Sequence, residues 1–518
     1  MAEYTQLQRE GLYELTESAR AQLVDSKYYN DDLAPTSYAE RTWNTYHISM
    51  LWVGMAICIP SFMMASGAVG FGLPVWAAVL NVILGNAIIL VPIQLNSHAG
   101  TKYGIPFPVF SRMTFGMRGA QIPTISRAIT ACGWNMVQSV TGGAALLFML
   151  KALVPAFNDL SVAAQVVAFL IFLAISGWLT ASGSKAIRIF ESFSSPILII
   201  LSIMLLIWAI VLANGAGYTF GDVFSSEISA GGLTESSQYA YFFCFALTGN
   251  IGFWATMALN IPDFSRYAKN QKVQFRGQMY GMLPGMAFCA LIGAFYAQST
   301  FLTLGTAYFN PVDALGVIND GSIAMRVVIF IVGIGVVFAT LTTNIAANIV
   351  APANGFSNLN PKKINYKMGT LIACIIAIVY YIPFTFSDSF GGFMFTFLNV
   401  YGGFLAPLAS IFILDYYFVK KRNVDISSLY SESTGARYWY KNGFNQYAVI
   451  AWIAGAILPT LISLVPALDV GALRWINANS YLFAFFVALI VYAIIMPRDH
   501  VSNLSDEEEA EMTEIVSA

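Results

Sequence analysis

Long apolar runs separated by short polar connectors dominate this sequence. A helix needs roughly twenty apolar residues to cross the hydrocarbon core of a bilayer. Twelve runs reach that length, at 47–69, 73–98, 119–150, 161–181, 189–213, 238–260, 278–301, 324–354, 367–385, 390–418, 445–465 and 475–497. We therefore predict an all-α polytopic membrane protein with twelve transmembrane helices.

The composition supports lipid as a major part of the solvent. Hydrophobic residues make up 57% of the 518 positions and charged residues only 10%, whereas soluble domains carry about 25% charged residues. The basic residues are also too sparse to form a patch that would bind nucleic acid. Lipid is therefore the expected surrounding medium.

The placement of Lys and Arg predicts the orientation of the chain. With a cytoplasmic N-terminus, only Lys151 and Arg474 among the 26 Lys and Arg residues fall in outer connectors. Arg127 and Arg326 lie within or at the edge of runs, which leaves 22 on the inner side. Since inner loops of membrane proteins are enriched in Lys and Arg, we predict a multi-pass protein of the cell (plasma or inner) membrane with both termini cytoplasmic.

The third run contains a candidate recognition pair. Trp134 and Gln138 are four residues apart, so they share one face of a helix. An indole offers a flat stacking surface, and a primary amide offers both a donor and an acceptor. Together they suit a planar ring with adjacent N–H and C=O groups. The alternative is an interfacial Trp with a Gln that packs between helices.

The eighth run carries a polar stripe. Thr340, Asn344 and Asn348 follow at intervals of four, and Thr342 and Thr343 add two hydroxyl groups. Ligands that are all oxygen suit a hard cation. The alternative is hydrogen bonding between helices, which Thr and Asn commonly supply.

Glycine and proline interrupt the first and sixth runs. Gly54 and Pro60 lie in the first, and Gly249 and Gly252 lie in the sixth. Broken helices in corresponding positions are typical of transporters with inverted repeats, in which they expose carbonyl groups to substrate and ion.

Few acidic residues lie within the runs. Glu191 and Asp415 lie near run ends, and the middles of the candidate helices carry neither Asp nor Glu. A neutral solute and one small cation therefore suit the site better than a cationic solute. There is no HExxH motif and no paired histidine, so we expect neither an enzyme nor a cofactor.

Several stretches resemble the nucleobase:cation symporter-1 family, which includes hydantoin, allantoin and nucleobase permeases. The resemblance runs from AERTW at 39–43 to DYY at 415–417, and its most specific stretches are NSHAGTKYGIPFP at 96–108, NIPDFSRY at 260–267 and NIAANIVAP at 344–352. The last two are closest to the allantoin and purine-related branch.

The resemblance implies a leucine-transporter-like fold of two inverted five-helix repeats plus two more helices. The expected divisions are a cytoplasmic N-terminal tail at 1–46, the first repeat at 47–213, the second at 214–418, the last two helices at 419–497 and an acidic cytoplasmic tail at 498–518. We expect the acidic tail to be solvated.

The resemblance also implies roles for individual residues. Trp134 and Trp254 would sandwich the ring, Gln138 and Asn348 would bind its amide edge, and Phe253 and Asn344 would line the same site. The carbonyl groups of Gly54, Ile57 and Ala339 with the hydroxyl groups of Thr342 and Thr343 would bind the coupling cation.

Three residues depart from the pattern of the hydantoin transporter. Cys58 stands in place of a glutamine, Phe253 in place of a glycine, and Asn135 in place of an apolar residue. The expected substrate is therefore an allantoin-like or nucleobase-like heterocycle.

The expected mechanism is import by cation-coupled alternating access, with sodium favoured over a proton and no obligatory protein partner. The alternatives are an amino-acid or amine transporter on the same fold, and a membrane sensor that does not transport.

Overall fold

The computed structural model of the protein describes residues 6–9, 11–154, 162–226, 233, 235–310, 313, 321–384 and 390–497. The acidic tail predicted at 498–518 lies outside these residues. Most of the described chain is helical, and a short antiparallel ribbon of β1 (Gln6–Arg9) and β2 (Leu12–Leu15) precedes the helices.

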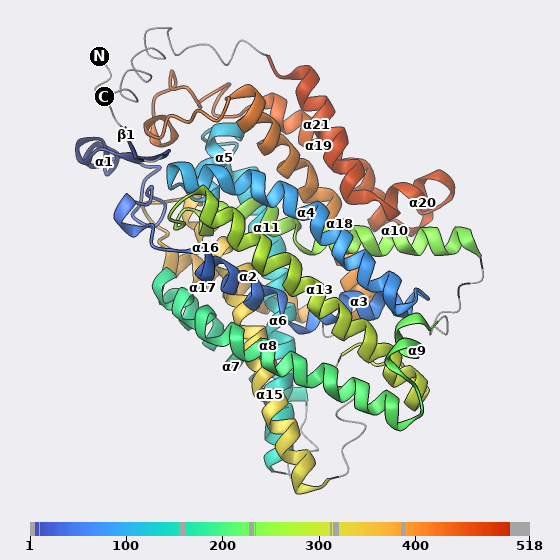
Figure 1. The fold of residues 1–518 in the computed structure, drawn as a ribbon. Helices are drawn as coiled ribbons and strands as arrows, with labels where there is room; N and C mark the ends of the chain where they lie inside the picture. Colours follow the sequence, from blue (N-terminus) through green and yellow to red (C-terminus); the bar gives the residue numbers. More distant parts are fainter. Residues whose placement is uncertain are drawn as a thin grey trace.

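The long helices follow one another along the whole chain (Figure 1). They are α2 (Thr45–Ala56), α3 (Ile59–Gly70), α4 (Val75–Tyr103), α6 (Gln121–Leu153), α7 (Val162–Ala181), α8 (Ser184–Gly215), α10 (Ser236–Phe253), α13 (Gln271–Leu304), α15 (Ile323–Thr343), α16 (Val350–Leu359), α17 (Tyr366–Phe384), α18 (Phe390–Leu414), α19 (Gln446–Leu464) and α21 (Ser480–Ile495). Shorter elements are α1 (Glu17–Leu23), α5 (Phe107–Phe115), α9 (Phe220–Ser225), α11 (Ala255–Asn260), α12 (Pro262–Ser265) and α20 (Gly471–Ala478), two π-helices, η3 (Asn344–Ile349) and η4 (Asp415–Val419), and 3-10 turns that include η1 (Tyr38–Glu40), η5 (Ser427–Tyr430) and η6 (Pro466–Leu468).

The predicted transmembrane runs coincide with these helices. In the described part of the chain, nine helical stretches are long and apolar enough to cross a membrane. Two further runs are bent pairs, α2 with α3 and α20 with α21, and the ninth run is the shorter apolar helix α17. Each of the twelve runs thus has its helix, and the prediction of an all-α polytopic membrane protein is confirmed.

The helices pack in interleaved groups. Helix α13 packs against α2, α3, α4 and α8, while α6 packs against α7, α15, α16 and α17 (Figure 1). Small residues allow the close approach: a Cβ on Gly293 of α13 would lie 2.2 Å from the carbonyl oxygen of Phe62 in α3. Membrane helices associate through such close packing rather than through the hydrophobic effect.

The first span is broken, as predicted. Helix α2 stops at Ala56, α3 starts at Ile59, and the two are bent by 54°. Cys58 between them is extended, with φ −147° and ψ 163°. A continuous helix would set the ring of Pro60 against the carbonyl group of Ala56 and would lack one hydrogen bond. The break therefore follows from the sequence.

The sixth span is interrupted less than predicted. Helices α10 and α11 form one continuous stretch that is interrupted only at Trp254, with φ −104° and ψ 10°. Gly249 and Gly252 lie inside α10. A Cβ on Gly252 would lie 3.2 Å from the carbonyl oxygen of Leu398, so this glycine serves the packing of α10 against α18.

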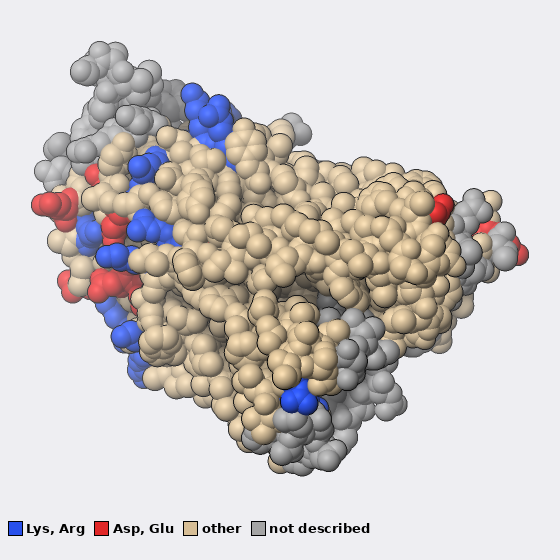
Figure 2. Space-filling view, turned by 60° about the horizontal axis from the view of Figure 1, so that its bottom comes forward, with Lys and Arg blue, Asp and Glu red and all other residues tan. Residues whose placement is uncertain are grey.

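Charged side chains gather over one end of the molecule, while a broad uncharged surface covers the middle of the face in Figure 2.

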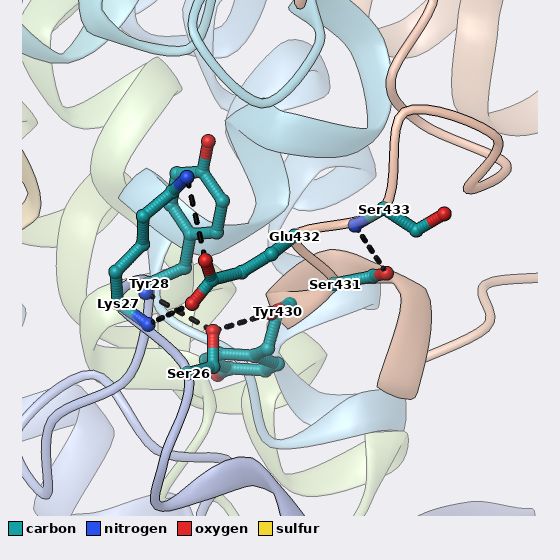
Figure 3. A network of polar contacts seen from close by, with 7 residues as sticks. All are labelled: Ser26, Lys27, Tyr28, Tyr430, Ser431, Glu432 and Ser433. Carbon is teal, nitrogen blue, oxygen red and sulfur yellow. Dashed lines mark hydrogen bonds and ion pairs between the residues drawn. The ribbon is translucent and has the colours of Figure 1, made fainter.

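The N-terminal segment, residues 11–44, is anchored by many contacts. Figure 3 shows part of its attachment to the connector after α18: Ser26 donates to the carbonyl oxygen of Tyr430 at 2.5 Å, and Lys27 pairs with Glu432 at 3.4 Å. The described part of the predicted N-terminal tail is thus folded against the helices.

Candidate functional site

A chain of four aromatic rings connects α6, α10 and α2. Trp134 meets Phe253 edge to face, with ring centroids 5.3 Å apart at 77°. Phe253 in turn meets Trp254 at 5.0 Å and 86°, and Trp254 meets Trp52 at 5.2 Å and 70°. All four side chains are buried. Phe253 is thus the ring that both predicted stacking tryptophans contact.

Tyr401 of α18 orients the first ring of this chain. The indole N–H of Trp134 donates to the Tyr401 hydroxyl at 3.1 Å, which leaves the indole faces for ring contacts. The sequence analysis missed Tyr401, because a lone Tyr in an apolar run is common in membrane proteins and carries little signal. Only the fold brings it to Trp134.

Amide side chains from α6 and η3 form a polar cluster beside the rings. Asn344 donates to Oδ1 of Asn135 at 2.8 Å, and Asn348 donates to Oδ1 of Asn344 at 3.3 Å. Oε1 of Gln138 and the indole N–H of Trp254 have no hydrogen-bond partner in the described part of the chain. Nε1 of Trp52 and Nδ2 of Asn135 are also buried without a partner in these residues, so the site holds one unused acceptor and three unused donors.

The amide cluster lies on a π-helix, η3, which the periodicity of the sequence did not predict. Pro352 in α16 has no N–H to bond the carbonyl group of Asn348, and its ring displaces that carbonyl, which favours a wider preceding turn. Single π-turns inside α-helices are frequent at functional sites. The wide turn presents Asn344 and Asn348 to α6.

The predicted cation ligands meet where α2 stops. Thr342 donates to the carbonyl oxygens of Gly54 at 2.8 Å and Ala339 at 2.9 Å. Thr343 lies 3.2 Å from the Gly54 oxygen, 3.1 Å from that of Met55 and 3.0 Å from that of Ala339.

The end of α2 explains why these carbonyl groups are available. The last carbonyl groups of a helix have no partner within it, and they form the negative end of its dipole. Ile57, in the break itself, belongs to the same apolar cluster as Ala339. The structure thus brings together four predicted ligands and places Ile57 beside them. The cluster is built from oxygen atoms alone, which suits a hard monovalent cation.

Cys58 connects the two parts of the site. It caps the start of α3, its thiol lies 3.3 Å from the Ser61 hydroxyl, and it faces the side chains of Gln138 and Thr343. The amide of the recognition pair and the hydroxyl of the cation cluster therefore share one neighbour at the helix break.

Glu191 lies further inside its helix than the sequence analysis placed it. The sequence set the start of the fifth run at residue 189, but α8 begins at Ser184, so Glu191 lies two turns inside it. Its side chain is 1% exposed. A Cβ on Gly54 would lie 2.1 Å from Oε2 of Glu191. Hydropathy placed the helix start too late because residues 184–188 include Lys185 and Arg188.

Arg127 is a buried arginine that contacts η3, and a cavity lies beside α16. Arg127 of α6 donates to Oδ1 of Asn260 at 3.0 Å and to the carbonyl oxygen of Ala347 at 2.7 Å. A cavity of about 380 Å³ lies between the N-terminal segment, α8 and α16, and its lining includes Trp43, Asp263 and Asn354. Val350, which follows η3 directly in the chain, also lines it.

Comparisons with known proteins identify the family. A family model described as permease for cytosine/purines, uracil, thiamine, allantoin matches residues 35–490. The purine-uracil permease of Arabidopsis thaliana is 37% identical over 485 residues, which cover 92% of this chain and 78% of that permease. The allantoin permease of Bacillus subtilis is 31% identical over 479 residues, which cover 91% of this chain and 94% of that permease.

A solved structure supports the fold. A transporter of the nucleobase-cation-symport-1 family, in a closed conformation with bromovinylhydantoin bound, matches with a TM-score of 0.76 and 25% identity over 93% of this chain and 98% of its own. The leucine-transporter-like architecture implied by the sequence is therefore confirmed. The repeat boundaries at 213 and 418 stay predictions. From the family model, the sequence relatives and this fold, we conclude that the chain belongs to the nucleobase:cation symporter-1 family of permeases.

Proposed function

We propose that this permease imports a small neutral heterocycle of the purine, uracil or allantoin kind by cation-coupled alternating access. The observation that carries this proposal is the position of the aromatic chain next to an unused acceptor on Gln138 and an unused donor on Trp254. A planar ring with adjacent N–H and C=O groups would use the ring faces and both polar groups together.

The proposed contacts set the scale of the affinity. Stacking on an aromatic side chain contributes about 1–3 kcal/mol, and each amide hydrogen bond adds about 1 kcal/mol net. Trp134 and Trp254 supply the ring faces, and Gln138 and Asn348 supply the amide contacts. Phe253 and Asn344 shape the site, Phe253 by contact with both indoles. These contributions sum to about 4–8 kcal/mol and support binding in the micromolar range at best.

The coupling ion is proposed to bind at the end of α2, and sodium is favoured over a proton. Gly54, Ile57, Ala339, Thr342 and Thr343 would provide oxygen ligands from two helices. Because a ligand shifts a conformational equilibrium only through its different affinity for the two states, a cation that joins α2 to α15 favours the state in which these helices are close.

Transport requires the site to open on each side in turn, because Trp134, Gln138 and Trp254 are all buried. The charged end of the molecule (Figure 2), with its N-terminal segment and the cavity beside α16, is proposed to face the cytoplasm. The positive-inside rule favours this orientation in the cell membrane.

An amine or amino-acid substrate is the main alternative. Its ammonium group would need a carboxylate at the aromatic chain, but Glu191 faces Gly54 instead. A sensor that does not transport would bind a heterocycle without accumulating it. Competition and uptake in the same vesicles separate these three functions.

The test is uptake of labelled uracil, adenine, allantoin and hydantoin into vesicles that contain the purified protein. We expect sodium-stimulated uptake of at least one of them, and its loss in Trp134→Ala. Trp178→Ala is the matched control, because Trp178 is 70% exposed on α7 and removes an indole away from the site. Equal uptake by wild type and Trp134→Ala would reject the proposed stack.

A further inference from the structure

Glu191 is a buried carboxylate without a partner. Neither of its oxygens has a hydrogen-bond partner in the described part of the chain, and no ion pair there includes it. A carboxylate removed from water is strongly destabilising unless an opposite charge or several donors compensate it. Ionisable residues inside membrane proteins commonly mark ion or substrate sites for this reason.

Gly54 lets the carboxylate of Glu191 approach the backbone of α2. A Cβ on Gly54 would lie 2.1 Å from Oε2 of Glu191 and 2.8 Å from Oγ of Ser195, so only glycine admits the carboxylate here. Ser195 is held in place by donating to the carbonyl oxygen of Met50 at 2.7 Å. The hydroxyl of Ser194 is also buried without a partner in the described residues.

Gly54 is the residue that α8 and α15 both contact. Its carbonyl oxygen accepts from Thr342 at 2.8 Å and lies 3.2 Å from Oγ1 of Thr343, while its Cα faces the carboxylate of Glu191. Since the Cα and the carbonyl group both belong to Gly54, the carboxylate of Glu191 and the oxygen cluster contact the same residue. The ligands of that cluster are all neutral, and Glu191 is the nearby group that can carry a negative charge.

We propose that Glu191 is the charged ligand of the coupling-cation site. The inference rests on the proposed function, in which the oxygen cluster at the end of α2 binds a monovalent cation. The bound cation compensates the buried carboxylate, and the carboxylate supplies the charge that the carbonyl and hydroxyl groups lack. The cation then ties α8 as well as α15 to α2, so three helices respond to one ion.

The test measures cation binding without any heterocycle. Purified protein in detergent is titrated with radiolabelled sodium, and its thermal unfolding is followed in sodium chloride and in choline chloride. Glu191→Gln keeps the shape of the side chain and removes its charge. Glu17→Gln is the matched control, because Glu17 is exposed on α1.

We expect Glu191→Gln to weaken sodium binding by about 10- to 100-fold, the range typical for the loss of a supporting metal-site group, and to abolish the sodium-dependent rise in Tm. Its Tm in choline should equal or exceed that of wild type, because a buried charge has been removed. Wild-type sodium affinity in Glu191→Gln would overturn the proposal.

A second variant keeps the test decisive if Glu191→Gln does not fold. Glu191→Asp retains the charge but withdraws it by one methylene, so sodium should still bind, severalfold more weakly; unchanged affinity would count against direct ligation.

A wild-type protein that binds heterocycles without any sodium response refutes the cation site alone. One that binds sodium through Glu191 but no heterocycle refutes the proposed substrate class and leaves this inference standing.

Discussion

The ring of Phe253 meets the indole of Trp134 edge to face, with centroids 5.3 Å apart. The same ring contacts Trp254, with centroids 5.0 Å apart. A substrate that stacks on these indoles must therefore displace Phe253 or share their faces with it. Phe253 is thus expected to limit the size of the accepted ring.

Replacing Phe253 by glycine should broaden the substrate range. Hydantoins with a bulky substituent on the ring should compete better for uptake, because the space of the phenyl group is released. The natural substrate should bind more weakly, by the loss of about 1–3 kcal/mol of aromatic contact. Competition assays on vesicles check both effects, with Phe486→Gly as the control because that ring is 54% exposed on α21. An unchanged substrate range would show that Phe253 does not border the substrate.

Two threonines of α15 contact the end of α2, and removing either hydroxyl should weaken the dependence of uptake on sodium. Thr342→Ala and Thr343→Ala each lose an oxygen ligand, and we expect a rise of about tenfold in the sodium concentration for half-maximal uptake. Thr180→Ala is the control, because its buried hydroxyl donates to the carbonyl oxygen of Ser176 within α7 at 2.8 Å. The account would be wrong if the site variants and this control gave the same sodium dependence.

The attachment of the N-terminal segment should depend on a buried arginine more than on the ion pair in Figure 3. Arg112 donates to the carbonyl oxygens of Leu429 at 2.9 Å and Tyr28 at 3.0 Å. Arg112→Ala leaves these neutral groups buried without a donor, at a cost of about 1–3 kcal/mol for each. Lys27→Ala removes an ion pair whose partners are 55% and 47% exposed, worth about 0–1 kcal/mol.

Thermal unfolding in detergent compares the two variants. Arg112→Ala should lower Tm clearly, while Lys27→Ala should leave it nearly unchanged. The opposite order would mean that the exposed ion pair, rather than the buried guanidinium, attaches the segment.

The fold was predictable from the sequence, because lipid imposes a length of apolar helix that few soluble proteins imitate. Each predicted run has its helix, and the bend at Cys58 follows from Pro60. Trp134 and Gln138 were predictable because polar and large aromatic groups within a run are conspicuous. The two threonines were predictable because they adjoin two asparagines in the same run.

The rest of the site depends on tertiary contacts. Glu191 reaches Gly54 from a different helix, and Tyr401 reaches Trp134 across 267 residues of sequence. The pattern of apolar and polar residues within one run does not reveal contacts between side chains of different helices. The π-helix η3 also breaks the spacing on which the polar stripe was predicted. Phe253 was expected to line the site, but its position against both indoles depends on the tertiary contact between Phe253 at the end of α10 and Trp134 of α6.

The most direct test of the central claim is a binding titration by intrinsic tryptophan fluorescence. Purified protein is titrated with uracil, adenine, allantoin and hydantoin, in sodium chloride and in choline chloride. The account predicts saturable quenching by at least one of these heterocycles, with tighter binding in sodium and with the signal lost in Trp134→Ala. Failure of all four to quench the wild-type protein in sodium would contradict it.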